Sequence, residues 1–200
     1  MIQKIVDRLA QSPQIFDSLR WTLEGGFNGH SKLIREELQN IPGQVLDLGC
    51  GTGIFAPYFE PERYTGVDIS EDYVRAAQLK YPKHRFQCVN AERLDFPDAS
   101  FDACFVAGVF HHLDDTVSEK VLREVRRVLK PSGVFVVWED IPSRASWNVV
   151  GHFVHAHDEG KHIRRPEGYR NLFGAQFRME KESFMRSGFM DYIVFRLRVH

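Results

Sequence analysis

The chain has 200 residues, of which 43% are hydrophobic and 26% charged, and this suits one α/β domain with a sizeable core. Its formal net charge is -1 and its Lys and Arg residues are spread out, so nothing indicates a nucleic-acid or anionic-membrane surface as the main partner. No segment is apolar for long enough to span a bilayer, and the N-terminus does not resemble a signal peptide, so we expect a single cytoplasmic domain.

The first 42 residues have the spacing of amphipathic helices. Apolar residues recur at helical spacing over residues 2–9, and Ser12-Pro13 is typical of the start of a second helix that ends at Gly25-Gly26. The apolar face of the second helix would be Ile15, Phe16, Leu19 and Leu23. A third helix is expected from an N-cap at Ser31 to Ile41-Pro42-Gly43. These helices either pad a sheet or form part of a wall over a ligand.

The stretch Val45-Leu46-Asp47-Leu48-Gly49-Cys50-Gly51-Thr52-Gly53 joins a short apolar run to three glycines at alternate positions. The run predicts a buried strand, and the glycines predict a tight turn whose backbone can approach a ligand closely. Ile54-Phe55-Ala56 is expected to open a helix whose free N–H groups favour electron-rich ligand atoms. We infer a site for a nucleoside-bearing cofactor. Spacing alone leaves its identity open, because Gly51 to Ala56 also fits the dinucleotide pattern G-x-G-x-x-[GA].

Two carboxylates lie beside this loop. Asp47 is inside the apolar strand, where it needs donors from loop N–H groups or from a cationic ligand end. Asp68 ends the second predicted strand, Tyr64–Ile69, where a carboxylate can accept from two ribose hydroxyls. The alternative is that Asp68 caps the next helix, but Ser70 already suits that position. That helix should end at Pro82.

The central part of the chain continues the alternation of strands and helices. Strands are predicted at Arg85–Val89, Phe101–Ala107 and Val134–Trp138, with a helix at Thr116–Leu129 and a turn at Lys130–Gly133. Cys50, Cys88 and Cys104 lie in or beside strands and include no C-x-x-C pair. We therefore expect three buried, reduced thiols.

Several of these segments, in this order, resemble class I S-adenosylmethionine-dependent methyltransferases of the UbiE-like, small-molecule (type 11) kind. The stretch Val45–Gly53 resembles their glycine motif, Asn90–Asp102 their adenine-reading segment, Gly108–Leu113 their "HHL" segment and Arg127–Gly133 their "RVLKPGG" turn. Asn90 stands where the family usually has Asp, and Ser132 replaces a glycine. The resemblance implies a Rossmann-like, doubly wound, three-layer α/β/α fold. Its seven-stranded sheet would be mostly parallel, with a C-terminal antiparallel hairpin.

The same resemblance implies S-adenosyl-L-methionine as cofactor and S-adenosyl-L-homocysteine as product. The implied cofactor contacts are Asp47, Gly49, Cys50, Gly51, Thr52, Gly53, Asp68, Ile69, Asn90, Ala91, Glu92, Ala107 and Gly108. Asp47 would face the amino end, and Ile69 would pack on the adenine. The oxygen of Asn90 would accept from the adenine amino group, and the Ala107-Gly108 backbone would lie beneath the sulfonium. His111 and His112 are candidates for proton handling, unless they only hold the loop.

Residues 141–165 are long for a connection and predict a lid or substrate segment, with a helix capped by Ser143. His152 shares a helix face with His155 in a local histidine cluster, but no matching Cys/His set exists elsewhere, so we expect no metal. His152, Arg164 and Arg165 are candidate substrate contacts, the arginines for an acidic group. Residues 166–200 should contain a short helix and two strands, Gln176–Arg186 and Tyr192–Val199; the alternative continues a helix through 179–185.

The chain is therefore predicted to be one methyltransferase domain, made of N-terminal helices (1–42), a cofactor core (43–140), the lid (141–165) and the C-terminal helix and hairpin (166–200). The expected reaction is methyl transfer to an O, N or C nucleophile of a small, apolar or aromatic molecule, with no nucleic-acid partner and no membrane span. Two alternatives stay open: a non-catalytic cofactor-binding partner subunit, and an NAD(P)-dependent oxidoreductase. The oligomeric state is not predicted.

Overall fold

The computed structural model describes residues 13–156 and 162–199. The helix expected over residues 2–9 lies outside the described residues, as do His157 and residues 158–161 of the predicted lid.

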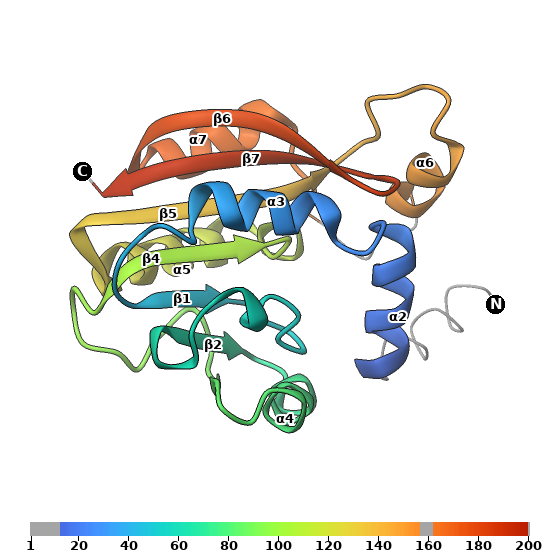
Figure 1. Cartoon of the computed structure of the whole chain (residues 1–200). Helices are drawn as coiled ribbons and strands as arrows, with labels where there is room; N and C mark the ends of the chain where they lie inside the picture. Colours follow the sequence, from blue (N-terminus) through green and yellow to red (C-terminus); the bar gives the residue numbers. More distant parts are fainter. Residues whose placement is uncertain (1–12, 157–161, 200) are drawn as a thin grey trace.

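The described residues form one seven-stranded sheet of order β3-β2-β1-β4-β5-β7-β6 (Figure 1). The strands are β1 (Val45–Leu48), β2 (Tyr64–Asp68), β3 (Arg85–Cys88), β4 (Phe101–Ala107), β5 (Leu129–Ile141), β6 (Phe177–Ser187) and β7 (Met190–Val199). The first five pair in parallel, whereas β7 runs antiparallel to both β5 and β6. The predicted sheet and its C-terminal hairpin are confirmed, and the alternative of a helix through 179–185 is wrong.

Helices cover both faces of the sheet, as expected for parallel strands buried on both sides. The helices are α2 (Pro13–Leu23), α3 (Asn28–Glu37), α4 (Glu71–Lys80), α5 (Asp115–Val128), α6 (Val149–Ala156) and α7 (Pro166–Gly174). Residues of α3 and α4 share one apolar core with one face of the strands, and residues of α5 and α7 share the other core with the opposite face. This arrangement is the predicted three-layer fold.

Alternation along β4 and β5 explains why one sheet has two cores. Cys104 and Val106 point into the core beneath α5, and Phe105 points into the core beneath α3. In β5, Trp138 is fully buried and stacks on Phe105 with the ring planes 4° apart. Such stacking fixes the register of the two central strands, whose ends carry the loops described below.

The N-terminal helices differ from the sequence prediction. The structure starts α3 at Asn28, and Ser31 is buried within it, where its hydroxyl meets that of Tyr58. The chain turns earlier because Gly25, Gly26 and Phe27 all have positive φ. The expected apolar face of α2 is also not the buried face, since Ile15 and Leu19 are exposed.

Three further expectations are wrong. Ile54-Phe55-Ala56 open no α-helix, because Pro57 and Pro61 interrupt the segment and leave two short 3-10 turns, η1 (Ala56–Tyr58) and η2 (Pro61–Arg63). Ser143 does not cap α6; Asn148 does, accepting from Gly151 N at 2.9 Å. Cys88 is exposed because it lies at the tip of the edge strand β3, although Cys50 and Cys104 are buried and all three are free thiols.

Candidate functional site

The glycine loop after β1 has two glycines that the packing requires and one that faces open space. All three have positive φ, between 52° and 79°. A Cβ at Gly49 would lie 2.4 Å from Val109, and one at Gly53 would lie 2.8 Å from Phe86, whereas a Cβ at Gly51 would meet nothing within 4 Å. Gly51 therefore presents bare backbone to the space outside the loop, as a close ligand contact requires.

Asp68, at the tip of β2, joins this strand to the glycine loop. Its Oδ2 accepts from Gly51 N at 2.9 Å, and its Oδ1 accepts from Ser70 N at 2.9 Å. Each carboxylate oxygen keeps acceptor capacity after these bonds. Ser70 caps α4 by accepting from Tyr73 N, so the cap predicted there is confirmed. The carboxylate is thus held at the loop with oxygens available for further donors.

Asp47 is buried inside the sheet with one oxygen unsatisfied. Its Oδ2 accepts from the Tyr64 hydroxyl at 2.6 Å, while Oδ1 has no hydrogen-bond partner within the described part of the chain. Burial raises the pKa of Asp47 to about 7, the nearby Asp68 charge raises it further and the Tyr64 hydrogen bond opposes the rise. An unsatisfied buried acceptor of this kind suits an N–H donor or ammonium group of a ligand.

The ends of β2 and β3 supply an exposed apolar side chain beside polar groups. Ile69 is 72% exposed directly after Asp68. Asn90 is also exposed, and its Oδ1 accepts from Glu92 N at 2.9 Å, which shapes the turn after β3. Glu92 pairs with Lys120 at 2.9 Å, and Ala91 packs against the core. An exposed isoleucine beside this turn is a surface on which a flat apolar ring can pack.

The turn after β4 is held by one buried carboxylate. Glu139, at the end of β5, is fully buried; its Oε1 accepts from Val109 N at 3.0 Å and from Phe110 N at 2.9 Å. Its Oε2 accepts from His111 N at 3.2 Å and lies 2.9 Å from His111 Nδ1. This turn begins at Gly108, whose φ is +69° and whose N–H donates to Trp138 O.

The geometry separates the two histidines after β4. Glu139 can accept a hydrogen bond from Nδ1–H of His111, which favours the Nδ1–H tautomer, and in that neutral tautomer Nε2 is the acceptor nitrogen. His111 is buried, whereas His112 is exposed and its ring centroid lies 4.0 Å from that of His111. Glu139 is not among the predicted site residues, because its only signal in the sequence is a charged residue after a continuous apolar strand.

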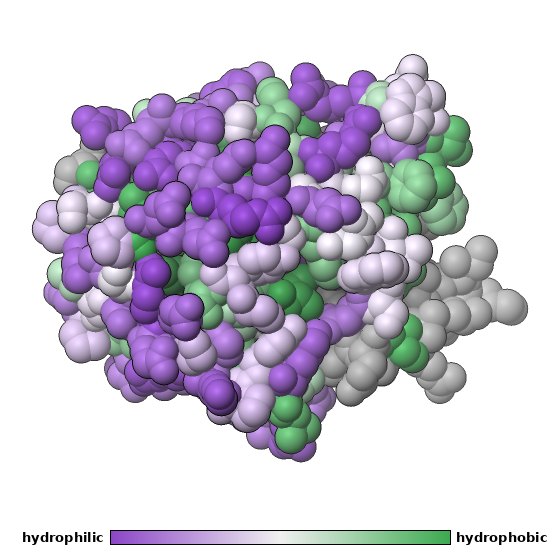
Figure 2. Space-filling model, viewed as in Figure 1, coloured by the Kyte–Doolittle hydropathy of each residue, from purple (hydrophilic) through white to green (hydrophobic). Residues whose placement is uncertain are grey.

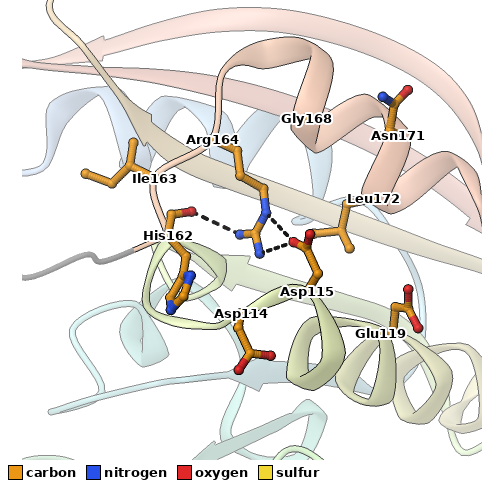
Figure 3. Close-up of a pocket in the computed structure, with 9 residues that line it drawn as sticks. All are labelled: Asp114, Asp115, Glu119, His162, Ile163, Arg164, Gly168, Asn171 and Leu172. Carbon is orange, nitrogen blue, oxygen red and sulfur yellow. Dashed lines mark hydrogen bonds and ion pairs between the residues drawn. The ribbon is translucent and has the colours of Figure 1, made fainter.

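The described end of the lid is fastened to this turn. The guanidinium of Arg164 donates to Phe110 O at 2.7 Å, to Leu113 O at 2.8 Å and to Asp115 Oδ1 at 2.7 Å. The backbone N–H of His162 donates to His111 O at 2.9 Å. A groove of about 600 Å³ lies beside these contacts, and Figure 3 shows Arg164 reaching across it to Asp115.

The other two predicted substrate residues, Arg165 and His152, do not share the contacts of Arg164. Arg165 is exposed at the start of α7, and the His152 ring lies 3.2 Å from Ala145 O in its own segment. No contact joins His152 to either arginine within the two described ranges. The described residues also contain no group of three or more His, Cys, Asp or Glu that could hold a metal ion.

Helix α2 lies across the glycine loop. Asp17 accepts from the Thr52 hydroxyl at 2.5 Å and from Lys80 Nζ at 3.1 Å, so one carboxylate ties α2 to the loop and to the end of α4. Arg20 pairs with Glu24 at 2.6 Å on the inner side of the same helix. Helix α2 thus contacts the glycine loop through Asp17.

Part of the chain is similar to a known protein family. Residues 46–137 match the family model described as a methyltransferase domain. A demethylmenaquinone methyltransferase from Thermotoga maritima is 34% identical over 148 residues, which are 70% of this chain and 61% of that protein. The chain thus spans less than two thirds of that relative's length.

Solved structures share the fold along nearly the whole chain. The PH0226 protein from Pyrococcus horikoshii has a TM-score of 0.68 and 25% identity, covering 94% of this chain and 92% of that one. A SAM-dependent methyltransferase from Aquifex aeolicus has a TM-score of 0.68 and 19% identity, covering 94% and 99%. Across the residues that the structure describes, no helix is both long and apolar enough to cross a membrane.

Proposed function

We propose that the chain contains a class I, S-adenosylmethionine-dependent methyltransferase domain and that it transfers the methyl group of this cofactor to an O, N or C nucleophile of a small molecule. The observation that carries the proposal is the bare backbone of Gly51 held beside the carboxylate of Asp68. Other residues at the carboxyl ends of the parallel strands have roles that follow from their positions.

We assign the cofactor contacts from these positions. The glycine loop, with Gly49, Cys50, Thr52 and Gly53 around Gly51, would enclose the methionine part. Asp68 has acceptor capacity for two ribose hydroxyls, and the unsatisfied Oδ1 of Asp47 suits the amino end. Ile69 and the turn containing Asn90, Ala91 and Glu92 would border the adenine. The Ala107-Gly108 backbone would lie beneath the sulfonium.

When bound, the cofactor supplies an electrophilic methyl group together with its own leaving group. The chain's residues therefore have to align a nucleophile behind that methyl group and exclude water. Alignment of this kind can lower a barrier by about 7–11 kcal/mol. The hydrogen bond from the Thr52 hydroxyl to Asp17 holds α2 against the glycine loop, and this contact would help to exclude water from the bound cofactor.

We propose His111 as the general base where the acceptor carries a proton. Glu139 orients its Nδ1–H and leaves Nε2 as the proton acceptor, as a positioned base requires. A base of this kind contributes about 10²–10⁴-fold in rate. The exposed His112 would contact the acceptor or the solvent.

The acceptor is proposed to be apolar or aromatic. The Thermotoga relative is named for action on demethylmenaquinone, an apolar ring compound. Arg165 and His152 remain candidates for contacting a polar end of the acceptor, because both side chains are exposed. The three guanidinium nitrogens of Arg164 already donate to Asp115, Phe110 and Leu113, so we propose that this residue positions the His111 turn instead.

Calorimetric titration with S-adenosylhomocysteine, beside a titration with NADH, tests the cofactor. We expect micromolar binding of the first compound and none of the second. Asp68→Ala should weaken that binding at least tenfold, because a charged acceptor contributes about 1.5–3 kcal/mol. Asp72→Ala is the matched control, since Asp72 is exposed in the first turn of α4. Binding of NADH instead, or equal binding by both variants, would refute the assignment.

A further inference from the structure

Apolar side chains are exposed together at the end of the molecule that carries α6 and the β6–β7 turn. They are Trp147, Val149, Val150, Phe153, Phe184 and Phe189. Trp147 is 71% exposed and Phe153 57%. Figure 1 places α6 beside the tip of the hairpin, and Figure 2 shows pale and green residues at this end. We call these six residues the α6 patch.

The α6 patch is one surface because a hydrogen bond and a close backbone approach join its two parts. Asn148, just before α6, donates to Phe189 O at 2.7 Å, and a Cβ on Gly151 would lie 2.5 Å from the same oxygen. The sequence of α6, VVGHFVHA, contains no Asp, Glu, Lys or Arg. Its inner side packs through Val154, and its exposed side carries Val149, Val150 and Phe153 beside His152. A surface with several large exposed apolar side chains is normally covered by something.

The charges around the patch indicate what covers it. The Arg144 guanidinium lies 4.0 Å from the centre of the Phe184 ring, and that of Arg186 lies 5.5 Å from the centre of the Trp147 ring. The carboxylate that pairs with Arg186, at 2.8 Å, belongs to Asp191, which is buried. Arg144 and Arg186 therefore place two exposed guanidinium groups beside the patch, although the net charge of the chain is -1. Arginine and aromatic side chains in this arrangement suit the boundary between lipid headgroups and acyl chains.

We propose that the α6 patch docks the protein on an anionic lipid surface. Trp147 and Phe153 enter the headgroup region, and Arg144 and Arg186 meet the lipid phosphates. The patch follows the carboxyl end of β5, the edge that carries the His111 turn, so docking brings that edge to the bilayer. The consequence, that an apolar acceptor reaches the site from the membrane, rests on the proposed function; the docking itself does not.

Vesicle flotation of the full chain tests the docking without any turnover. Vesicles of phosphatidylcholine with phosphatidylglycerol are compared with vesicles of phosphatidylcholine alone. The wild type should float with the anionic vesicles and bind the neutral ones at least tenfold less. The double variant Trp147→Ser with Phe153→Ser should lose at least tenfold in partitioning, since the two side chains bury apolar area only on docking.

The control variant is Leu79→Ser, because Leu79 is 80% exposed on α4 and lies outside the patch. It should float like the wild type. Arg144→Gln should lower the partitioning only on anionic vesicles. No flotation, or flotation that the double variant leaves unchanged, would overturn the proposal. So would a dimer in light scattering that the double variant dissociates, because the patch would then bind a second copy of this chain. Calorimetry with S-adenosylhomocysteine on the same samples reports separately on the cofactor site.

Discussion

His111 Nδ1 lies 2.9 Å from Glu139 Oε2, and this carboxylate also accepts hydrogen bonds from the backbone N–H groups of Val109, Phe110 and His111. One side chain at the end of β5 therefore fixes both the path of the neighbouring turn and the tautomer of its histidine. Because Glu139 is fully buried, solvent cannot replace any of these bonds. Its contribution to folding and its contribution to chemistry can be separated by two different variants.

Glu139→Gln tests the contribution to folding. Glutamine keeps one carbonyl oxygen for two donors but turns its amide N–H₂ toward the other two. Each buried donor left unpaired costs about 1–3 kcal/mol, so the free energy of unfolding should fall by several kcal/mol. Urea denaturation followed by circular dichroism measures the change. Glu119→Gln, on the exposed face of α5 and 3.9 Å from Arg123, should change it by less than about 0.5 kcal/mol. An unchanged midpoint for Glu139→Gln would refute the four-donor arrangement.

His111→Asn tests the contribution to chemistry. The asparagine amide can donate to Glu139 much as Nδ1–H does, but it has no counterpart of Nε2. Turnover should fall about 10²–10⁴-fold while the affinity for S-adenosylhomocysteine stays the same. The measurement is transfer of a labelled methyl group to the best acceptor from a screen of quinols and phenols. His112→Asn is the comparison variant and should retain most activity. Full turnover in His111→Asn would leave His111 as a structural residue only.

The layers of the fold could be predicted from the sequence, because a buried strand or helix face has a recognisable local pattern of apolar residues. The continuous apolar run Val134–Trp138 indicates a strand covered on both faces, and it lies within β5. The glycine loop and Asp68 also follow from local signals, since each is adjacent to the strand end that positions it. The hairpin at the C-terminus follows from Gly188, which takes φ +57° in the turn.

The polar contacts of the site could not be predicted in this way. Glu139 and Phe110 are 29 residues apart, Arg164 and Phe110 are 54 apart, and Asp17 and Thr52 are 35 apart. No periodicity connects such pairs, because their meeting depends on which strands become neighbours. The wrong apolar face for α2 has the same origin: Ile15 and Leu19 have helical spacing, but the helix is joined to the glycine loop and to α4 through Asp17 instead.

The pH dependence of stability should reveal Asp47. Its pKa is raised from 3.8 to about 7 in the folded protein, chiefly by burial, so between these values only the folded state keeps the proton. The contribution of Asp47 to the free energy of unfolding therefore decreases as the pH rises from about 4 to 7, by up to about 1.4 kcal/mol per pH unit. It is constant above that range.

Asp47→Asn isolates this effect from other groups. Burial lowers the pKa of His30, so this residue makes the free energy of unfolding rise with pH below the ordinary pKa of histidine. The wild-type curve alone therefore does not separate the effects of Asp47 and His30. The difference in unfolding free energy between Asp47→Asn and the wild type should grow in favour of the variant between pH 5 and pH 7. Asparagine keeps an acceptor for the Tyr64 hydroxyl. Urea titrations at half-unit pH steps measure the difference, and a difference independent of pH would show that Asp47 is ionised throughout.

Alanine at two positions of the glycine loop should separate folding from cofactor binding. Gly51 and Gly53 both have positive φ, so alanine at either costs about 1–2 kcal/mol in strain. At Gly53 the new methyl group also meets the Phe86 ring at 2.8 Å and Ala77 at 3.2 Å, which adds a packing cost of about 1–3 kcal/mol. At Gly51 it meets no protein atom within 4 Å, so Gly51→Ala should be the more stable variant.

Because the free space at Gly51 is where we place the cofactor, Gly51→Ala should nevertheless bind S-adenosylhomocysteine at least tenfold more weakly than the wild type. Urea denaturation and calorimetry on both variants measure the two effects. Wild-type affinity in a folded Gly51→Ala protein would place the cofactor away from this loop.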